Sequence, residues 1–244
     1  MLYGQKSKVR YIEMEGLSMI YVMSDIHGNM EKFNSIIKQI NLQESDTLYV
    51  LGDVIDRYGD AIKILRRLIK MDNVKMLLGN HEYMMLQSLN PYSIQENSEQ
   101  ERARALQLWH SNGGEITHNY IKHIRIDFRK EVFEYLKSLP LEYEVIVNEI
   151  KYLLVHASPV RAYNKSKYKN ETEFAVWNRW KRGDSIPKEY TMIFGHTPTS
   201  FFRAIEPLQI WREGRAIAID CGCGYFDGRL ACLRLDDMKV FYSE

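Results

Sequence analysis

Short apolar runs alternate with amphipathic helical patterns through the first half of the chain. The apolar run at 18–23 (SMIYVM) precedes a segment at 30–40 whose apolar residues recur at helical spacing. The run at 46–51 (DTLYVL) precedes a second such segment at 60–71, and a third run follows at 74–78 (VKMLL). Because strands that alternate with helices build βαβ units, this pattern predicts an α/β fold with a parallel sheet.

The remainder of the chain divides into a helical middle and a strand-rich end. Residues 83–138 are predicted to be mostly helical, with Asn90-Pro91 ending the first helix. The closely spaced apolar runs at 142–156 predict a hairpin and therefore some antiparallel pairing. Since no repeat or Pro/Gly-rich linker interrupts the chain, we expect one domain over 19–244, preceded by an extension of uncertain role at 1–18.

Composition excludes several classes of function. The chain has 244 residues, 45% of them hydrophobic and 27% charged, and its net charge of +1 offers no footprint for a nucleic acid or a membrane surface. Its apolar runs are too short for transmembrane helices, and its N-terminus lacks the apolar core of a signal peptide. Three cysteines, at 221, 223 and 232, form an odd set that favours buried, reduced thiols and a cytoplasmic location.

Polar motifs follow five of the apolar runs. Ligands of α/β sheets bind in the crevice at the carboxyl ends of the strands, so we expect these five ends to gather their side chains in one place. The set comprises two carboxylates, three imidazoles and one amide oxygen, and such mixed ligation suits Mn²⁺, Fe or Zn²⁺. The candidate metal ligands are Asp25, His27, Asp53, Asn80, His156 and His196.

Six ligands suffice for two metals if one carboxylate, most naturally Asp53, bridges them. Two metals roughly 3.5–4 Å apart can hold a hydroxide and bind both oxygens of an in-line displacement at phosphorus. Each motif alone has a structural explanation: a turn, a hydrogen-bonded histidine, or a helix start capped by Asn80 and favoured by Glu82. Five such motifs together would need five independent explanations, which favours the metal site.

These motifs, in this order, resemble those of the calcineurin-like metallophosphoesterases. The resemblance covers about 20–225, and the glutamate of the third motif and the Asp56-Arg57 pair are similar to the bacterial type of the phosphoprotein (serine/threonine) phosphatase branch. The motifs are DIHG at 25–28, GDVIDR at 52–57, GNHE at 79–82, VHASP at 155–159 and GHTP at 195–198.

The resemblance implies a fold and a set of metal ligands. The fold would be an α/β/β/α sandwich of two mixed β-sheets flanked by helices. The resemblance implies two divalent transition-metal ions, with Mn²⁺ expected and Fe or Zn²⁺ as alternatives. The first metal would be bound by Asp25, His27 and Asp53, and the second by Asp53, Asn80, His156 and His196.

The resemblance also implies catalytic roles. His81 would be the general acid for the leaving oxygen, held and charged by Asp56. Arg57 would grip the phosphoryl oxygens. Arg179, within AVWNRW, would be a second phosphate-binding arginine, or instead a surface arginine stacked between two tryptophans.

The implied activity is hydrolysis of phosphomonoesters by direct attack of metal-bound hydroxide. A phosphoserine or phosphothreonine protein is the expected substrate, with small phosphoesters also in reach; metal identity and oligomeric state stay open. One rival is a symmetrical dinucleoside tetraphosphate hydrolase, a group that generally has aspartate where this chain has Glu82. A non-catalytic binding module is disfavoured, because every ligand and His81 are retained.

The chain departs from the family pattern at three places. Ser24 replaces a glycine, Tyr58 separates Arg57 from the following glycine, and 157–159 (ASP) replaces two glycines after His156. These departures leave every ligand in place but weaken any inference about substrate. The segment at 108–114 (LWHSNGG) could cap the site, although a plain helix and turn is the favoured interpretation.

Overall fold

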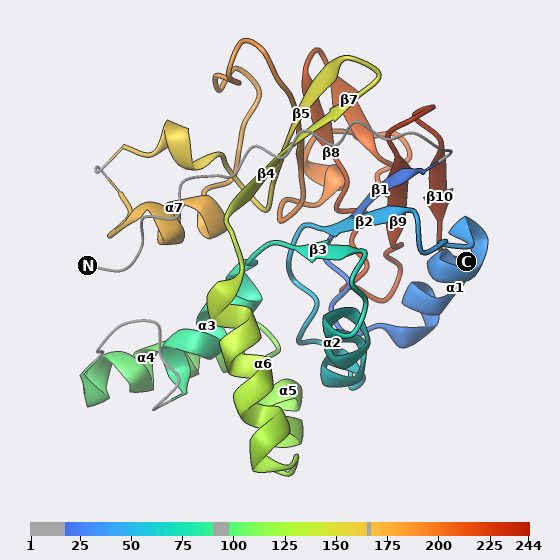
Figure 1. Cartoon of the computed structure of the whole chain (residues 1–244). Coiled ribbons are helices and arrows are strands. Elements are labelled where there is room, and N and C mark those ends of the chain that lie inside the picture. The colour runs from blue at the N-terminus through green and yellow to red at the C-terminus, as the bar shows by residue number, and fades with distance from the viewer. Residues whose placement is uncertain (1–17, 90–97, 165–166) are drawn as a thin grey trace.

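The computed structural model describes residues 18–89, 98–164 and 167–244 (Figure 1). Two mixed sheets of five strands each are flanked by helices, which confirms the predicted α/β sandwich. The extension expected at 1–18 lies outside the described residues except for its last residue, and the Asn90-Pro91 helix end lies outside them too. The single-domain organisation stays a prediction.

The first sheet has the strand order β10-β9-β1-β2-β3. Its parallel part is formed by β1 (Ile20–Met23), β2 (Thr47–Val50) and β3 (Val74–Met76), as the βαβ pattern predicted. At the other side β9 (Ala231–Arg234) and β10 (Val240–Tyr242) run antiparallel.

The two crossover helices are α1 (Met30–Ile40) and α2 (Ala61–Ile69). The Asn29 side chain accepts the backbone N–H of Lys32 at 3.1 Å and so caps the start of α1. At the other end Asn41 takes a left-handed conformation, a common way to end a helix. Both helices bury their apolar faces against the first sheet.

The second sheet has the strand order β4-β5-β6-β8-β7. The predicted hairpin is formed by β4 (Glu142–Val147) and β5 (Ile150–Val155). Parallel pairing continues through β6 (Thr191–Phe194) to β8 (Ala216–Ala218), and β7 (Trp211–Glu213) closes the edge antiparallel.

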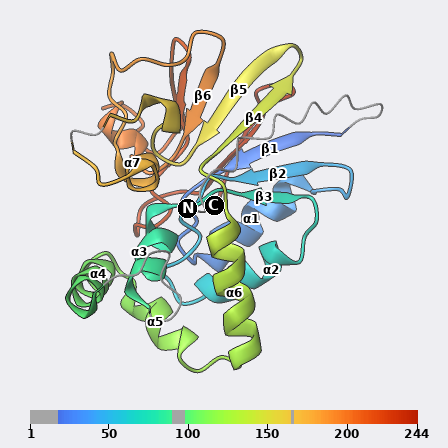
Figure 2. The same ribbon diagram turned by 60° about the vertical axis from the view of Figure 1, so that its left-hand side comes forward.

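Alternation along each strand produces the layers. Ile20 and Val22 of β1 pack on the second sheet, whereas Tyr21 and Met23 pack on the helices, because successive side chains of a strand point to opposite faces. In Figure 2 strands β1, β2 and β3 lie between the β4–β5 hairpin and helices α1 and α2. The core is therefore divided into an inter-sheet layer and a helix–sheet layer.

The helical middle contains α3 (Asn80–Ser88), α4 (Glu99–Ser111), α5 (Glu115–Ile121) and α6 (Ile126–Ser138). The sequence pattern predicts a mostly helical middle but does not separate α5, which follows α4 after a sharp turn at Gly113 and Gly114. A side chain at Gly114 would overlap the indole of Trp109, so this glycine permits a close approach.

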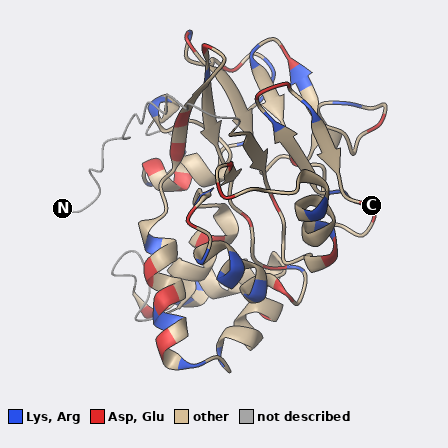
Figure 3. Ribbon diagram, turned by 45° about the vertical axis from the view of Figure 1, so that its right-hand side comes forward, with Lys and Arg blue, Asp and Glu red and all other residues tan. Residues whose placement is uncertain are grey.

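The remaining helices are short: α7 (Glu171–Trp177) and the 3₁₀ turns η1 (Val160–Ala162) and η2 (Thr199–Phe201). The three cysteines are buried and unpaired, as predicted. Acidic and basic positions are interspersed over the ribbon (Figure 3). Within the described part of the chain, no helix has both the length and the apolar character needed to cross a membrane.

Candidate metal centre

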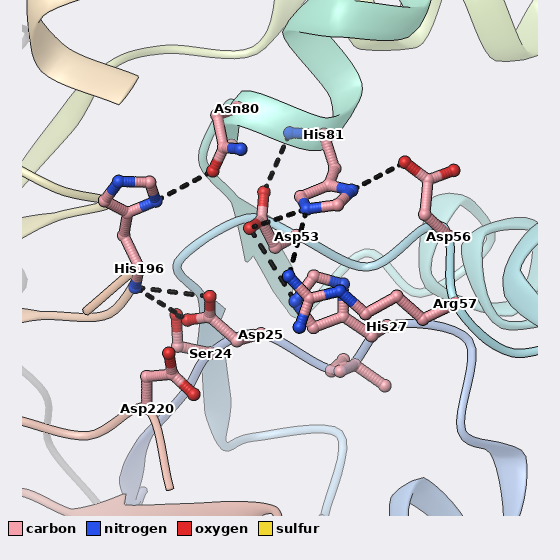
Figure 4. A network of polar contacts seen from close by, with 12 residues as sticks. Ser24, Asp25, His27, Asp53, Asp56, Arg57, Asn80, His81, His196 and Asp220 are labelled. Atoms are coloured by element: carbon pink, nitrogen blue, oxygen red, sulfur yellow. Dashed lines mark hydrogen bonds and ion pairs between the residues drawn. The ribbon is translucent and has the colours of Figure 1, made fainter. Parts of the chain in front are cut away.

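Segments from both sheets meet in one hollow (Figure 4). The first sheet supplies the loops after β1 and β2, and α3 begins there directly after β3, while the second sheet supplies the ends of β5 and β6. All six predicted ligands are buried. The five motifs that lie far apart in sequence are therefore brought together, as the strand-end argument predicted.

The backbone is left-handed at six residues whose side chains were assigned to the site. Positive φ crowds the Cβ of an L-residue and costs roughly 1–2 kcal/mol each. Such strain persists only where surrounding contacts enforce it, and it gathers at functional sites. The residues are Asp25 (φ 56°), His27 (51°), Asp53 (54°), Asp56 (74°), Arg57 (68°) and His196 (61°).

One group of polar atoms converges on Asn80. His156 Nε2 lies 3.0 Å from Asn80 Oδ1 and 3.5 Å from Asp53 Oδ1, and His196 Nδ1 lies 2.8 Å from the same amide oxygen. His156 Nδ1 donates to the backbone oxygen of Leu51 at 2.6 Å, which leaves Nε2 as a lone pair in the neutral ring. A nitrogen lone pair and two oxygen acceptors that face one another in a buried place repel each other, and a bound cation would remove this repulsion by coordinating all three atoms.

A second group lies on the other side of Asp53. His27 Nε2 is 3.9 Å from Asp53 Oδ2, and its Nδ1 donates to a backbone oxygen at 3.2 Å, so Nε2 again offers a lone pair. Asp25 lines the same hollow, where its carboxylate accepts the backbone N–H of His196 at 3.0 Å and the hydroxyl of Ser24. Ser24, which replaces the family glycine, therefore orients a predicted ligand.

The donor set fits divalent metal ions. Among the described residues, two sets of side chains hold their candidate ligand atoms within 4.8 Å of one another, and the two sets share Asp53. One set is His27, Asp53 and His81, and the other is Asp53, His156 and His196. The predicted ligand Asp25 lines the hollow but belongs to neither set. His196 Nε2 is buried and has no hydrogen-bond partner among the described residues. Burial lowers the pKa of His27 and of His196 well below the usual value, so both rings are neutral and able to coordinate. Burial, reinforced by the charge of Asp53, raises the pKa of Asp25 to about 6, and a cation would relieve this repulsion.

His81 is held against Asp56. Its Nδ1 donates to Asp56 Oδ2 over 2.6 Å, and both side chains are buried. Its Nε2 lies 3.9 Å from Asp53 Oδ2, so the free end of the ring faces the carboxylate shared by the two groups. Burial alone would lower the pKa of His81, but the charges of Asp53 and Asp56 outweigh burial and raise it.

The segment at 108–114 is the end of helix α4 and a turn, which was the favoured interpretation, and it also contacts the site. Trp109 Nε1 donates to Asp56 Oδ2 at 2.7 Å, and Asn112 lines the hollow. The backbone oxygen of Gly113 accepts the N–H of Arg57 at 3.1 Å. The sequence could not reveal these contacts, because they join a helix end to a loop more than fifty residues earlier.

Both predicted arginines line the hollow. Arg57 Nη2 lies 3.5 Å from His81 Nε2, and its guanidinium stands 4.8 Å from the ring centre of Tyr225. Arg179 donates to the backbone oxygen of His196 at 3.2 Å, and its guanidinium stands 5.7 Å from the ring centre of Phe201. Their roles in binding phosphate stay predictions, but their positions suit that role.

Two buried acids also support the centre. Glu82, for which the sequence predicted no contact with the loop after β2, accepts the backbone N–H of Asp53 at 2.9 Å and of Val54 at 2.8 Å. Asp220 lines the hollow, and burial together with the charge of Asp25 raises its pKa well above the usual value. Asp220 ends the apolar run at 215–220, so the signal that found the other five strand ends would have found it as well.

Comparison with known proteins agrees with this centre. Among curated proteins, the symmetrical bis(5'-nucleosyl)-tetraphosphatase of Acidovorax sp. (strain JS42) is 28% identical over 165 residues. The match covers 66% of this chain and 52% of that protein, so the chain spans about half the length of this relative.

Solved structures share the fold. A structure provisionally assigned as a diadenosine tetraphosphatase has a TM-score of 0.60 at 17% identity, with 92% of each chain covered. A protein serine/threonine phosphatase from Saccharomyces cerevisiae has a TM-score of 0.53 at 14% identity, with 93% of this chain and 79% of that chain covered. A family model described as calcineurin-like phosphoesterase matches residues 18–237, and the chain belongs to that family.

Proposed function

We propose that the protein is a two-metal hydrolase that cleaves dinucleoside tetraphosphates symmetrically. The observation that carries the reaction class is the pair of candidate ligand sets that share Asp53, one of which includes His81, whose Nδ1 is bonded to Asp56. The tetraphosphatase among the curated relatives supports a phosphoanhydride substrate over the phosphoprotein that the motifs first suggested. Two bound divalent cations, for which we propose Mn²⁺ with Fe or Zn²⁺ as alternatives, would supply charge neutralisation and water activation.

The side chains of this chain perform the remaining work. Arg57 and Arg179, which both line the hollow, hold the phosphoryl oxygens by forked hydrogen bonds. His81, whose Nδ1 is fixed on Asp56, presents its Nε2 proton to the leaving oxygen. Trp109 donates to the same carboxylate oxygen and so holds Asp56 in place while the proton moves.

A second candidate is a serine/threonine protein phosphatase. Glu82 favours it, because the tetraphosphatase group generally has aspartate at this position. Here the longer side chain reaches the backbone N–H groups of Asp53, Val54 and Ile55, the last at 3.2 Å. An aspartate at position 82 has a side chain one methylene shorter, so its carboxylate would not reach from α3 to the same three N–H groups.

The test compares Mn²⁺-dependent kcat/KM on diadenosine tetraphosphate, a phosphoserine peptide and p-nitrophenyl phosphate. We expect the highest value on diadenosine tetraphosphate, with ADP as the nucleotide product, because symmetrical cleavage yields two identical halves. A higher kcat/KM on the phosphopeptide would replace the proposal with the protein phosphatase. If the products were AMP and ATP, the protein would still be a tetraphosphatase, but its cleavage would not be symmetrical.

A further inference from the structure

A second cavity adjoins the metal centre. Its volume is about 310 Å³, at the lower end of the range of small-molecule sites, which is roughly 300–1,000 Å³. Its walls come from 198–201, 207–208, 221–222 and 225–228. Phe201 and Phe226 line it although they are 72% and 92% exposed. Since these rings contribute little to the core, their position at a concave surface points to a ligand.

The cavity and the metal centre share a wall. Pro198 and Tyr225 line both of them. Each predicted phosphate-binding arginine is backed by an aromatic ring of the cavity, because the Arg57 guanidinium stands over Tyr225 and the Arg179 guanidinium over Phe201. A molecule whose phosphates lie at the two arginines can therefore extend its next group into the cavity.

We infer that this cavity binds the nucleobase of a nucleoside polyphosphate substrate, an inference that rests on the proposed function. Aromatic side chains such as Phe201 and Phe226 stack on the flat faces of bases. Asp227 also lines the cavity. Its carboxylate would repel a phosphate group and forms no hydrogen bond with an aliphatic group, but it can accept a hydrogen bond from an N–H group of a base. Ring surface and acceptor together fit a purine with an exocyclic amino group.

The first experiment measures binding without catalysis. Adenosine, which carries no phosphate, is added to the purified 244-residue chain, and its contact with the protein is followed by saturation-transfer NMR. We expect a signal for the unchanged protein, its loss in Phe226→Ala and its return in Phe226→Tyr. Ile205→Ala is the matched control, because Ile205 is 80% exposed in the same region but does not line the cavity.

The second experiment measures the effect on turnover. In Phe226→Ala the KM for diadenosine tetraphosphate should rise about tenfold relative to the KM for p-nitrophenyl phosphate, as the loss of one base–aromatic stack implies. Ile205→Ala should leave both values unchanged. The ratio of the two KM values separates the cavity from the reacting centre.

The outcomes separate this inference from the proposed function. If diadenosine tetraphosphate is hydrolysed but Phe226→Ala changes neither its KM nor adenosine binding, the base site is overturned while the function stands. If the tetraphosphate is not hydrolysed but Phe226→Ala still abolishes adenosine binding, the base site stands and the proposed function is rejected. If Phe226→Ala weakens a phosphopeptide and leaves adenosine unaffected, the cavity serves a protein substrate instead.

Discussion

Single residues of the metal centre combine function with local strain. Asp56 and Arg57 are consecutive and both left-handed, with φ of 74° and 68°. Hydrogen bonds hold this turn: the N–H of Arg57 donates to Gly113, and the N–H of Tyr58 donates to the backbone oxygen of His27 at 3.1 Å. The inserted Tyr58 therefore ties the second motif to the first, and it does not displace the arginine.

Glycine should relieve the strain at position 57. We expect Arg57→Gly to be more stable than Arg57→Ala by about 1 kcal/mol, because only glycine accepts positive φ without a steric cost. Both variants should lose phosphoesterase activity. Thermal unfolding would show the two melting temperatures about 2–4 °C apart.

The matched control for this pair lies in α2. Arg66 is exposed within that helix, where alanine is favoured over glycine by roughly 0.5–1 kcal/mol. The order of stability should therefore reverse between positions 66 and 57. If Arg57→Ala were at least as stable as Arg57→Gly, the turn would carry no backbone strain at position 57.

At the scale of elements, helix α3 organises the centre through its first turn. Asn80 and His81 face the hollow from this turn, and Glu82 lies at its third position. The carboxylate of Glu82 accepts four backbone N–H groups, one from Gly79 at 3.2 Å and three from the loop after β2. The start of α3 and the loop that carries Asp53 are therefore one hydrogen-bonded unit.

Glu82→Gln should disrupt this unit. The amide NH2 group that replaces one carboxylate oxygen cannot accept a hydrogen bond, so two of the four buried N–H groups lose their acceptor. We expect a loss of about 2–4 kcal/mol in the free energy of unfolding. Glu101→Gln is the matched control, because Glu101 occupies the same third position of α4 on an exposed surface. Its cost should stay within about 0.5 kcal/mol. Denaturant unfolding measures both, and equal costs would contradict the bridging role of Glu82.

At the scale of the whole molecule, the two sheets supply ligands to one centre. Asp25, His27 and Asp53 follow strands of the first sheet, whereas His156 and His196 follow strands of the second. A cation bound among them would link the sheets through contacts that the unfolded chain lacks. Metal binding should therefore stabilise the entire fold.

Mn²⁺ should raise the melting temperature of the protein, and a chelator should reverse the change. One ion at a hundred times its Kd adds about 2.7 kcal/mol. For a chain of this size that gain corresponds to roughly 5–10 °C. Asp53→Asn should lose the shift together with the metal content measured by mass spectrometry, while the exposed Asp127→Asn keeps both. If Mn²⁺ raised the melting temperature of Asp53→Asn as much as that of the unchanged protein, Asp53 would not be a metal ligand.

The sequence by itself determined the parts of the protein that depend on local patterns. The βαβ units, the 142–156 hairpin and the five polar strand ends could be predicted, because strand and helix periodicity and turn residues are properties of short segments. The six candidate ligands followed from one rule about strand ends, and the same rule, applied once more, would have included Asp220. The structure places five of them around the hollow, and His156 lies against Asn80 and Asp53, while their roles as ligands stay predictions.

The tertiary structure decided what depends on contacts between distant segments. The three-residue strands β7 and β10 exist because a neighbouring strand pairs with them, and α5 exists because Gly114 lets the chain turn against Trp109. The contact of Trp109 with Asp56 joins residues 53 positions apart. The cavity beside the arginines is formed by loops whose sequences carry no periodic signal. Such features arise from packing and long-range hydrogen bonds, and a linear sequence does not display them.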